Sequence, residues 1–249
     1  MEPKYKRVVI KISGEALAGG SKFGISEETL LRVAKEIKEV RGLGVEVAIV
    51  IGGGNFWRGR ELKPFLDRSR SDQIGMLGTV MNSLYLSERF KLSDVNSIVM
   101  TPFQVGAFTE IFSREAAISA MKRGEVVINA GGTGHPFFST DTTAALRAAE
   151  LKADCVFYAK NIDGVYTADP CKVPEARKFR YVTYQRIIEG RLLALDSAAI
   201  SISQEAGIDS FVFGLNETDS ILRACQSAEG QANLSGTMIS KCCKEEYYV

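Results

Sequence analysis

The chain has 249 residues, and its 31 Lys and Arg residues nearly balance 30 Asp and Glu residues, which leaves a formal net charge of +1. With 45% hydrophobic residues, this composition argues against a disordered chain, a polybasic nucleic-acid binder and a membrane-surface patch, because each would unbalance these sums. A chain of this length allows one large domain or two small ones, with a sizeable core. We expect small neutral or anionic partners and no nucleic acid.

The apolar stretches are too short for a membrane span. The longest, 45–51, includes Glu46, and the N-terminal run 8–10 stops at Lys11. A span needs roughly 18–20 apolar residues, and the N-terminal run is also too short for a signal peptide. Five scattered cysteines without a Cys-x-x-Cys pair suit reduced thiols. We therefore expect a cytoplasmic protein. The single histidine, His135, argues against a zinc site or a serine triad.

Strand-like and helix-like segments alternate along the chain, and no linker or internal repeat divides it. Continuous apolar runs predict strands at 7–13, 45–51, 97–100, 125–130, 155–159 and 210–213. Apolar residues at helical spacing predict helices at 26–42, 74–84, 113–122, 140–151, 196–205 and 219–227. This alternation predicts an α/β fold in which helices cover both faces of a mostly parallel sheet.

Glycine-rich segments follow three of the predicted strands. Gly14 follows the first, 52–54 the second and 131–134 the fourth. In open α/β sheets a ligand crevice lies outside the carboxyl ends of the strands, and backbone N–H groups of such loops bind anions, phosphate above all. A tight turn explains any one of these loops, but three at equivalent strand ends favour a phosphate site. The Walker A, Gly-x-Gly-x-x-Gly and His-Arg-Asp signatures are absent from the sequence.

Two cationic residues are candidates for a phosphate site, because phosphoryl transfer needs cations, backbone donors and Mg²⁺ more than it needs a nucleophile. Lys11 interrupts the apolar run 8–12, where an unpaired ammonium is costly unless it reaches a ligand or solvent. Arg58 follows the triple glycine by four residues. The alternatives are a lysine that extends along the surface to solvent and an ordinary surface arginine.

Two aspartates open predicted helices. Asp141 follows the fourth-strand glycine loop, and it either caps the helix or orients a lysine or a magnesium-bound phosphate. Asp72 either caps its helix or belongs to the site, because Arg68 and Arg70 just before it can approach a phosphate.

Four motifs carry a resemblance. They are Lys-Ile-Ser-Gly-Glu-Ala-Leu at 11–17, Gly-Gly-Gly-Asn-Phe-Trp-Arg-Gly at 52–59, Gly-Thr-Gly-His-Pro-Phe-Phe-Ser-Thr-Asp at 132–141 and Asp-Gly-Val-Tyr-Thr-Ala-Asp-Pro at 163–170. In this order and spacing, the chain resembles the bacterial UMP kinases of the amino-acid-kinase superfamily over residues 7 to 240.

The resemblance implies a three-layer αβα sandwich with a mostly parallel central sheet, the amino-acid-kinase fold. It implies one domain over 1–249, with a UMP-binding lobe over about 1–150, an ATP-binding lobe over about 151–240 and a short tail, 241–249. It further implies conversion of UMP to UDP with ATP and Mg²⁺ in pyrimidine nucleotide biosynthesis, no direct protein ligand for the metal, and a homohexamer.

Residue by residue, the resemblance implies a catalytic set of Lys11, Arg58 and Asp141. It implies ATP contacts at Lys11, Ser13, Gly14, Gly54, Arg58, Lys160, Asn161, Tyr166 and Asp169. It implies UMP contacts at Gly53, Asp72, Thr133, Gly134, His135, Pro136, Phe137, Phe138, Ser139 and Thr140.

In some relatives a loop contributes to an allosteric GTP site, and here it matches Gly19, Gly20, Ser21, Lys22, Phe23 and Gly24. GTP as an activator and UTP as an inhibitor follow from the resemblance only, because such coupling depends on subunit contacts. The chain departs from the family pattern at 160–162, which leaves open whether Lys160 or Asn161 takes the second cationic role. The tail 241–249 runs beyond the family's normal end and carries no assigned function.

Two alternatives stay open. One is a related kinase that phosphorylates a carboxylate, a carbamate or another phosphate, which would not need the long 133–141 segment. The other is a non-catalytic nucleotide-binding protein on the same fold, which would not need Lys11, Arg58, Asp141 and Asp169 together.

Overall fold

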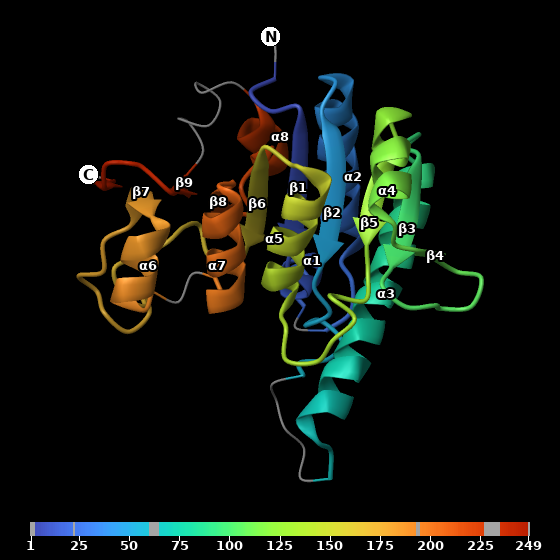
Figure 1. Cartoon of the computed structure of the whole chain (residues 1–249), viewed down its shortest axis with the longest axis horizontal. Coiled ribbons are helices and arrows are strands. Elements are labelled where there is room, and N and C mark those ends of the chain that lie inside the picture. Colours follow the sequence, from blue (N-terminus) through green and yellow to red (C-terminus); the bar gives the residue numbers. More distant parts are fainter. Residues whose placement is uncertain (1–2, 22, 60–64, 193–194, 227–234, 249) are drawn as a thin grey trace.

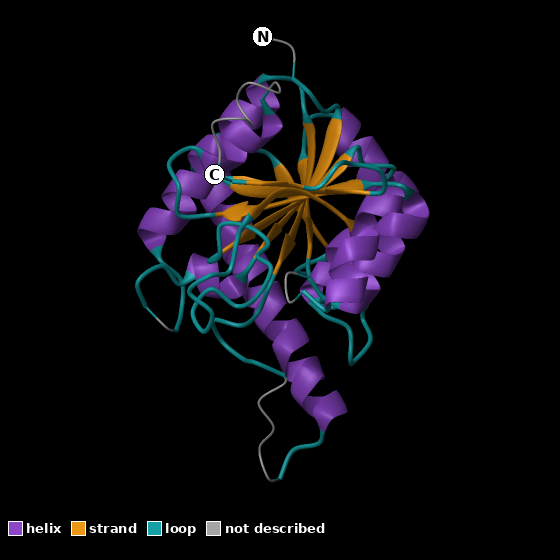
Figure 2. Ribbon diagram, turned by 90° about the vertical axis from the view of Figure 1, so that its left-hand side faces the viewer, coloured by secondary structure: helices purple, strands orange, loops and turns teal. Residues whose placement is uncertain are grey.

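One large sheet lies between two layers of helices (Figure 1, Figure 2). The computed structural model describes residues 3–21, 23–59, 65–192, 195–226 and 235–248. Within these residues the sheet has ten strands, in the order β10-β7-β9-β8-β6-β1-β2-β5-β3-β4. Every neighbouring pair is parallel except β8–β9 and β7–β10. The predicted α/β fold with a mostly parallel sheet is therefore confirmed.

The strands are short, as is usual for a sheet covered on both faces. They are β1 (Arg7–Ile12), β2 (Glu46–Ile51), β3 (Ser97–Thr101), β4 (Glu110–Ile111), β5 (Val126–Asn129), β6 (Cys155–Lys160), β7 (Phe179–Thr183), β8 (Asp209–Gly214), β9 (Gly236–Ser240) and β10 (Glu246–Tyr247). All six predicted strands are present, with ends that differ by a few residues. The short edge strand β4 and the strands β7, β9 and β10 were not predicted, because their residues mix polar and apolar types without a clear period.

The helices are α1 (Gly14–Leu17), α2 (Glu27–Gly42), α3 (Arg68–Lys91), α4 (Arg114–Lys122), α5 (Thr140–Leu151), α6 (Tyr184–Gly190), α7 (Ser197–Ala206) and α8 (Ser220–Cys225). The six predicted helices are present. Helix α3 is much longer than the predicted 74–84, and its first half projects beyond the sheet (Figure 1). No helix among the described residues is long and apolar enough to cross a membrane.

Side-chain alternation in β1 explains how the sheet supports two separate cores. Val8, Ile10 and Ile12 pack into the core under α2, α3 and α8. Val9 packs into the other core, under α4, α5, α6 and α7. Because successive side chains of a strand point to opposite faces, Lys11 belongs to the same face as Val9 and therefore points toward the α5 layer.

Gly14 marks the closest approach of two glycine loops. A Cβ built there would lie 2.5 Å from Asn55 Oδ1 and 2.7 Å from the Gly52 carbonyl oxygen. We expect Gly14→Ala to lower the free energy of unfolding by about 1–3 kcal/mol, because the loops would have to separate. Urea denaturation measures the change.

Gly42→Ala is the matched control. Gly42 lies at the end of α2, and a Cβ there meets no atom within 4 Å. It should leave stability unchanged or raise it by about 0.5–1 kcal/mol. Equal losses in the two variants would contradict the close approach of the loops.

Candidate active site

The loops after β1, β2 and β5 meet at one edge of the sheet, as the three glycine segments predicted. β1 and β2 are paired in register from Arg7 with Glu46 to Ile12 with Ile51, and β5 pairs with the other side of β2. Their carboxyl ends therefore open onto the same crevice. β6 flanks β1 on its other side, so Lys160 at its end lies next to this edge.

A buried cluster of two lysines and one aspartate lies at this edge. Lys11 Nζ is 2.9 Å from Asp141 Oδ1, and Lys160 Nζ donates a hydrogen bond of 2.7 Å to Asp141 Oδ2. Lys11 is 7% exposed and Asp141 8% exposed. The surface alternative for Lys11 is therefore wrong. Lys160 shares the face of Val156 and Tyr158, since alternate residues of β6 point the same way.

The charges of the cluster depend on one another. Burial alone raises the pKa of the Asp141 carboxyl, but the ammonium groups of Lys11 and Lys160 outweigh it and hold this pKa well below its usual range. Burial lowers the pKa of Lys160, against the opposing effect of Asp141, and Lys11 adds to the lowering. The cluster thus places two ammonium groups around one carboxylate, an arrangement with an excess of positive charge that suits an anionic ligand.

The N-terminus of α5 fixes Asp141 from the backbone side. Ser139, and not Asp141, is the N-cap, and its Oγ accepts hydrogen bonds from the N–H groups of Asp141 (3.0 Å) and Thr142 (3.4 Å). Asp196, the N-cap of α7, accepts from the hydroxyls of Ser139 and Thr142. The alternative in which Asp141 caps the helix is therefore wrong, because the N-cap lies two residues earlier.

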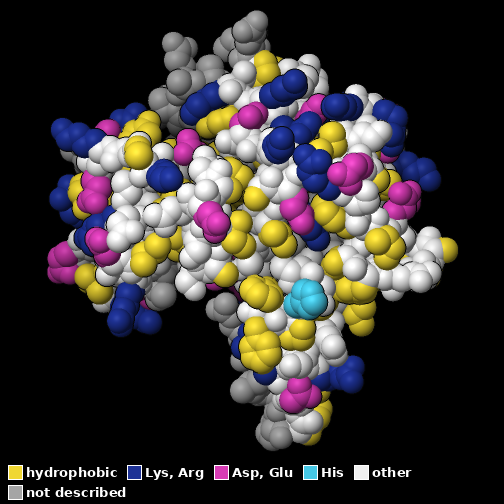
Figure 3. Space-filling model, in the orientation of Figure 1, with side chains coloured by type: hydrophobic (Ala, Val, Ile, Leu, Met, Phe, Trp, Pro, Cys, Tyr) yellow, Lys and Arg dark blue, Asp and Glu magenta, His cyan; other side chains and the backbone are white. Residues whose placement is uncertain are grey.

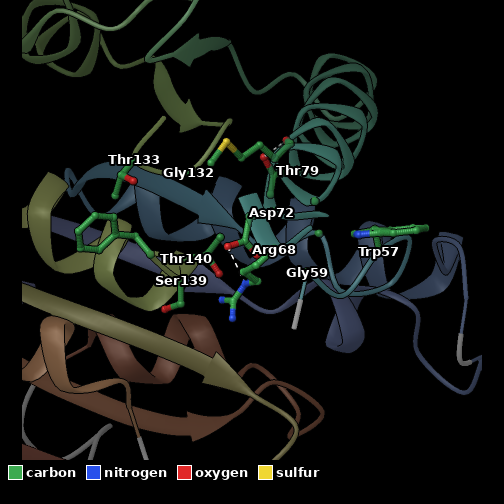
Figure 4. A pocket seen from close by; sticks show the side chains of 13 residues that line it. Trp57, Gly59, Arg68, Asp72, Thr79, Gly132, Thr133, Ser139 and Thr140 are labelled. Atoms are coloured by element: carbon green, nitrogen blue, oxygen red, sulfur yellow. Dashed lines mark hydrogen bonds and ion pairs between the residues drawn. The ribbon is translucent and has the colours of Figure 1, made fainter. Parts of the chain in front are cut away.

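A smaller pocket of about 160 Å³ opens beside the cluster (Figure 4). Figure 4 shows side chains from α3, from the loop after β5 and from the start of α5 around it. Its walls are Gly53, Trp57, Gly59, Arg68, Asp72, Gly75, Met76, Thr79, Gly132, Thr133, Phe138, Ser139 and Thr140. The structure thus brings together six residues matched to the nucleoside monophosphate: Gly53, Asp72, Thr133, Phe138, Ser139 and Thr140.

Asp72 ties α3 to the loop after β5. Its Oδ2 accepts a hydrogen bond of 2.8 Å from the Phe137 N–H and one of 2.8 Å from Arg68 Nε. The Arg68 guanidinium also lies 5.3 Å from the centre of the Phe137 ring. Asp67, and not Asp72, caps α3. The cap prediction for Asp72 is therefore wrong, because α3 begins four residues before it.

The rest of the 133–140 segment is largely at the surface. Thr133 Oγ1 accepts from the His135 N–H at 3.3 Å. His135 and Phe137 are exposed, and the single histidine is cyan in Figure 3. Gly134, which precedes His135, and Pro136, which follows it, are of intermediate burial. The segment thus forms a rim beside the smaller pocket.

A larger pocket of about 830 Å³ lies on the other side of the cluster. Lys11, Glu15, Asp141 and Lys160 line it together with Asp196. Its apolar wall comes from α6, α7 and the segment between them, with Ile187, Ile188, Leu192, Leu195 and Ile200. Ser139 and Thr140 line both pockets. The cluster therefore stands at the junction of a small polar pocket and a larger pocket with one apolar wall.

Sequence reasoning missed the apolar wall of the larger pocket. The helix at 196–205 was predicted, but its spacing indicates only an amphipathic helix, and α6 was not predicted. Arg191 also lines this pocket, in a left-handed conformation with φ of 49° at the end of α6. Arg191 directly follows Gly190, and this cation after a glycine is the one sequence signal that could have pointed to the larger pocket.

Other residues matched to the family lie around these pockets. Ser13 caps α1 and accepts a hydrogen bond of 3.1 Å from the Ala16 N–H. Arg58 forms a 3.0 Å ion pair with Glu15, and both side chains are about half exposed. Gly54 also lies against Glu15, because a Cβ there would be 3.3 Å from its Oε1. Arg58 is thus paired with Glu15, a residue that lines the larger pocket.

The loop after β6 carries three further matched residues. Tyr166 donates a hydrogen bond of 2.7 Å to Asp163, and burial together with this bond raises the pKa of Tyr166 to about 12. Asp169 is exposed and accepts from the Cys171 N–H at 3.0 Å. Asn161 is exposed, whereas its neighbour Lys160 reaches Asp141. None of the three lines either pocket described above.

The segment matched to the allosteric loop contacts the triple glycine. The Gly24 N–H donates to the Asn55 carbonyl oxygen at 3.2 Å, and Asn55 Nδ2 donates to the Gly24 carbonyl oxygen at 2.7 Å. Asn82 in turn donates to Asn55 Oδ1 and to the Gly52 carbonyl oxygen, both at 2.7 Å. Gly19, Gly20, Ser21 and Phe23 lie at the end of α1 and after it, and Lys22 lies outside the described residues.

Comparisons with known proteins agree with this geometry. The model of the amino acid kinase family matches residues 6–214. Two proteins of Limosilactobacillus reuteri named uridylate kinase, one from strain DSM 20016, are 47% and 46% identical over 237 residues, which cover 94% of this chain and 98% of each relative.

Two solved structures are also similar. The UMP kinase of Bacillus anthracis is 33% identical, with a TM-score of 0.91 over 98% of this chain and 99% of that one. The UMP kinase of Ureaplasma parvum is 31% identical, with a TM-score of 0.88 over 96% and 100%. The chain therefore belongs to the amino acid kinase family.

Proposed function

We propose that this protein is a UMP kinase, which transfers the γ-phosphoryl group of ATP to UMP and yields UDP and ADP. The observation that carries the proposal is the buried Lys11–Asp141–Lys160 cluster at the junction of two pockets. The smaller pocket takes UMP and the larger one takes ATP, so the cluster faces the point where two phosphate groups meet. The relatives named uridylate kinase and UMP kinase support this choice of acceptor.

The mechanism is direct in-line transfer. An oxygen of the UMP phosphate attacks the γ-phosphorus, and the bond from that phosphorus to the bridging oxygen of ADP breaks. The acceptor is largely ionised near neutral pH, so the reaction needs no general base. Lys11 and Lys160 stabilise the charge on the equatorial oxygens, and Asp141 holds both ammonium groups in place. Backbone N–H groups of the glycine loops bind the triphosphate of ATP and the phosphate of UMP, and Arg58 adds a further cation.

The ATP side extends beyond the larger pocket. Lys160 opens the loop that carries Asn161, Tyr166 and Asp169, and we assign this loop to ATP together with the larger pocket. Ser13, Gly14 and Gly54 complete it from the N-terminal loops. The apolar wall of α6 and α7 provides the surface against which a purine base can pack. The lobe boundary near residue 150 then falls between the acceptor and donor sides.

The side chains of the cluster are paired with one another. Asp141 is paired with two lysines, and no group of three metal-ligating side chains occurs among the described residues. We propose that Mg²⁺ binds to the ATP phosphates without a direct protein ligand. It would neutralise part of the phosphate charge during transfer.

A coupled assay of ADP release tests the function. It offers UMP, CMP, dUMP, acetylglutamate and carbamate in parallel, each with ATP and Mg²⁺. We expect UMP to give by far the highest kcat/KM. Preferential turnover of acetylglutamate or carbamate would indicate a related kinase instead, and ATP binding without any acceptor-dependent ADP release would indicate a binding protein.

Asp72→Asn should act on UMP and not on ATP. Asp72 lines the smaller pocket and holds Phe137 and Arg68 at its rim. Loss of a charge-assisted hydrogen bond is worth about 1.5–3 kcal/mol, so we expect the KM for UMP to rise about 10- to 100-fold while the KM for ATP changes less than twofold. Steady-state kinetics with each substrate varied in turn measures both.

The control for Asp72→Asn is Asp67→Asn. Asp67 caps α3 five residues earlier, at the Arg70 N–H. It should leave both KM values unchanged. A parallel rise in the two KM values of Asp72→Asn would argue against the assignment of the smaller pocket to UMP.

We further propose a cytoplasmic homohexamer that acts in pyrimidine nucleotide biosynthesis. Leu77, Met81 and Tyr85 recur every four residues on α3, and each is about half exposed. Such an apolar stripe supports contact with another subunit. Analytical ultracentrifugation measures the size of the assembly.

Activation by GTP and inhibition by UTP belong to the same proposal. The Gly19–Gly24 segment contacts the triple glycine through Asn55, which supports coupling between an effector on that segment and the active site. Turnover measured with and without each nucleotide tests both effects.

A further inference from the structure

The C-terminal segment packs against the ATP side of the sheet. Glu246 and Tyr247 form β10, which pairs antiparallel with β7. The Tyr247 ring lies 4.6 Å from the Phe179 ring, and Arg180 forms a 3.0 Å ion pair with Glu246. Residues 246–248 are thus held by backbone pairing, by ring contact and by charge.

Tyr248 joins the segment to two neighbouring strands. Its N–H donates a hydrogen bond of 3.1 Å to the Lys178 carbonyl oxygen. Its hydroxyl donates to the Gly236 carbonyl oxygen at 2.7 Å and accepts from the Gly236 N–H at 3.1 Å. The Lys178 ammonium lies 4.4 Å from the centre of the Tyr248 ring. Tyr248 therefore restricts the position of the Lys178 side chain.

Lys178 in turn contacts the loop after β6. Its Nζ donates a hydrogen bond of 2.8 Å to Asp163 Oδ2, and Tyr166 donates to Asp163 Oδ1 at 2.7 Å. Ser235 also contacts both the Lys178 ammonium and Asp163. The Lys178 side chain is 13% exposed. The Asp163 side chain is 40% exposed, so the pair is shielded from the lysine side, where Ser235 and the Tyr248 ring contact the ammonium group.

Asp163 stands three residues after Lys160 of the catalytic cluster. Between the cluster and Tyr166, the loop is fixed at the Lys160 carbonyl oxygen by the Leu215 N–H and at the Val165 N–H by Thr237 Oγ1. The Asp163 carboxylate is therefore one of two side-chain anchors of the loop, and its cationic partner is positioned by Tyr248. The other is Thr167, whose Oγ1 accepts a hydrogen bond of 3.0 Å from the Arg177 N–H, a contact that does not involve Tyr248.

We propose that Tyr248 is a positioning residue for the ATP side of the active site, acting through Lys178 and Asp163 on the loop 161–167. The inference rests on the proposed function, because it takes this loop to contact ATP. The segment 241–248 holds the loop in its binding-competent conformation, and its removal lowers the population of that conformation. Apparent affinity for ATP falls by the same factor, whereas the UMP pocket is on the other side of the cluster.

The test compares Tyr248→Phe with a chain that lacks residues 244–249. Tyr248→Phe removes the hydroxyl contacts with Gly236 and keeps the ring over Lys178. The variant loses two hydrogen bonds, and only part of this loss reaches ATP, because it acts through Lys178 and Asp163. We expect a roughly two- to tenfold rise in the KM for ATP, with kcat and the KM for UMP within twofold of wild type. The truncated chain should show a larger rise, because it also loses the ring and β10.

Two measurements separate this proposal from the proposed function. Calorimetric titration with ATP alone reports its Kd without turnover, and hydrogen exchange reports protection of the amides at 161–167. We expect a higher Kd and lower protection in both variants. If the wild type fails to phosphorylate UMP, the proposed function falls, while these two measurements still decide the role of Tyr248.

The matched controls are Tyr181→Phe on β7 and Cys243→Ser within the same segment. Both should retain the wild-type Kd for ATP and the wild-type exchange at 161–167. Wild-type Kd and exchange in both the Tyr248→Phe and the truncated proteins would overturn the proposal. So would an equal rise of the KM values for UMP and ATP, since that outcome indicates a general loss of structure.

Discussion

Replacing Lys11 by alanine is expected to lower kcat by about 10²–10³-fold, the range found when one preorganised electrostatic donor is removed from an active site. Lys11 is buried at the end of β1, with its ammonium 2.9 Å from Asp141. In the variant, Asp141 balances Lys160 alone, and the excess positive charge that faces the phosphates is lost. Because the same charge acts on the transition state and to a lesser degree on bound ATP, kcat should fall more than the KM for ATP rises.

Steady-state kinetics with saturating UMP measures the effect, and the far-ultraviolet circular dichroism spectrum checks the fold. Lys38→Ala is the control, because Lys38 is an exposed lysine of α2 that pairs with Asp94 at 3.2 Å. It should keep wild-type turnover. Near-normal turnover of Lys11→Ala would remove Lys11 from the catalytic set.

Much of this site could be predicted from the sequence, because the strongest signals were local. A lysine inside an apolar strand is costly unless it has a partner, and three glycine segments after three strands indicated one shared edge. In the structure, β1, β2 and β5 are parallel neighbours, so the three glycine segments do lie at one edge of the sheet. The sequence also offered Asp141 as the carboxylate that orients a lysine, with a helix cap as the alternative. The packing of α5 on the sheet, which no local pattern reveals, brings Asp141 to Lys11.

The choice between Lys160 and Asn161 shows the same limit. The family resemblance implied that both lie near the phosphates, and one residue of register decides which of them points to the α5 face. The pairing of β6 with β1 and β8 extends the strand to Lys160, so its side chain reaches Asp141. Register of this kind depends on long-range pairing, and no local pattern at 155–162 reveals it.

The two helix caps failed for a related reason. Aspartate is a common N-cap residue, and Asp141 and Asp72 both lie near the start of a helical pattern. In the structure, Ser139 and Asp67 are the N-caps, because each helix begins before its aspartate. Each displaced aspartate was then left inside the first turns of its helix, facing the two pockets. A residue that resembles a cap but lies within the helix is therefore a useful sign of a functional carboxylate.

The near-zero net charge of the chain is compatible with a positively charged active site. The proposed substrates are multiply anionic, yet the formal net charge of the chain is only +1. The positive field is local, since it comes from two buried ammonium groups around one carboxylate together with backbone N–H groups. A low-dielectric, water-poor edge of the sheet strengthens such a small number of charges, so no excess of basic residues is needed.

Asp141→Asn should therefore damage both activity and stability. Without the carboxylate, two ammonium groups face each other in a buried site, and breaking a buried pair by removing one partner costs about 3–5 kcal/mol at neutral pH. We expect turnover to fall by a factor comparable with that of Lys11→Ala. The pKa of Lys160, already lowered by burial, should fall further.

The stability difference between wild type and Asp141→Asn should change with pH in a definite direction. The pKa of Asp141 in the folded protein lies below its unfolded value of about 3.9, so its stabilising contribution is present above that value and is lost as the pH falls. The stability gap between wild type and Asp141→Asn should therefore narrow from pH 6 to pH 3. Lys160 binds its proton less well in the folded variant than in the unfolded chain, so the variant should gain stability relative to wild type from pH 7 to pH 9.

Urea denaturation at each pH measures these differences. Asp94→Asn is the control, because Asp94 pairs with Lys38 at the surface with its side chain 90% exposed, and an exposed pair contributes about 0–1 kcal/mol. Its stability should follow that of wild type across the range. A constant gap between Asp141→Asn and wild type from pH 3 to pH 9 would mean that the carboxylate is not the charge that holds the two lysines, and the electrostatic account of the site would fail with it.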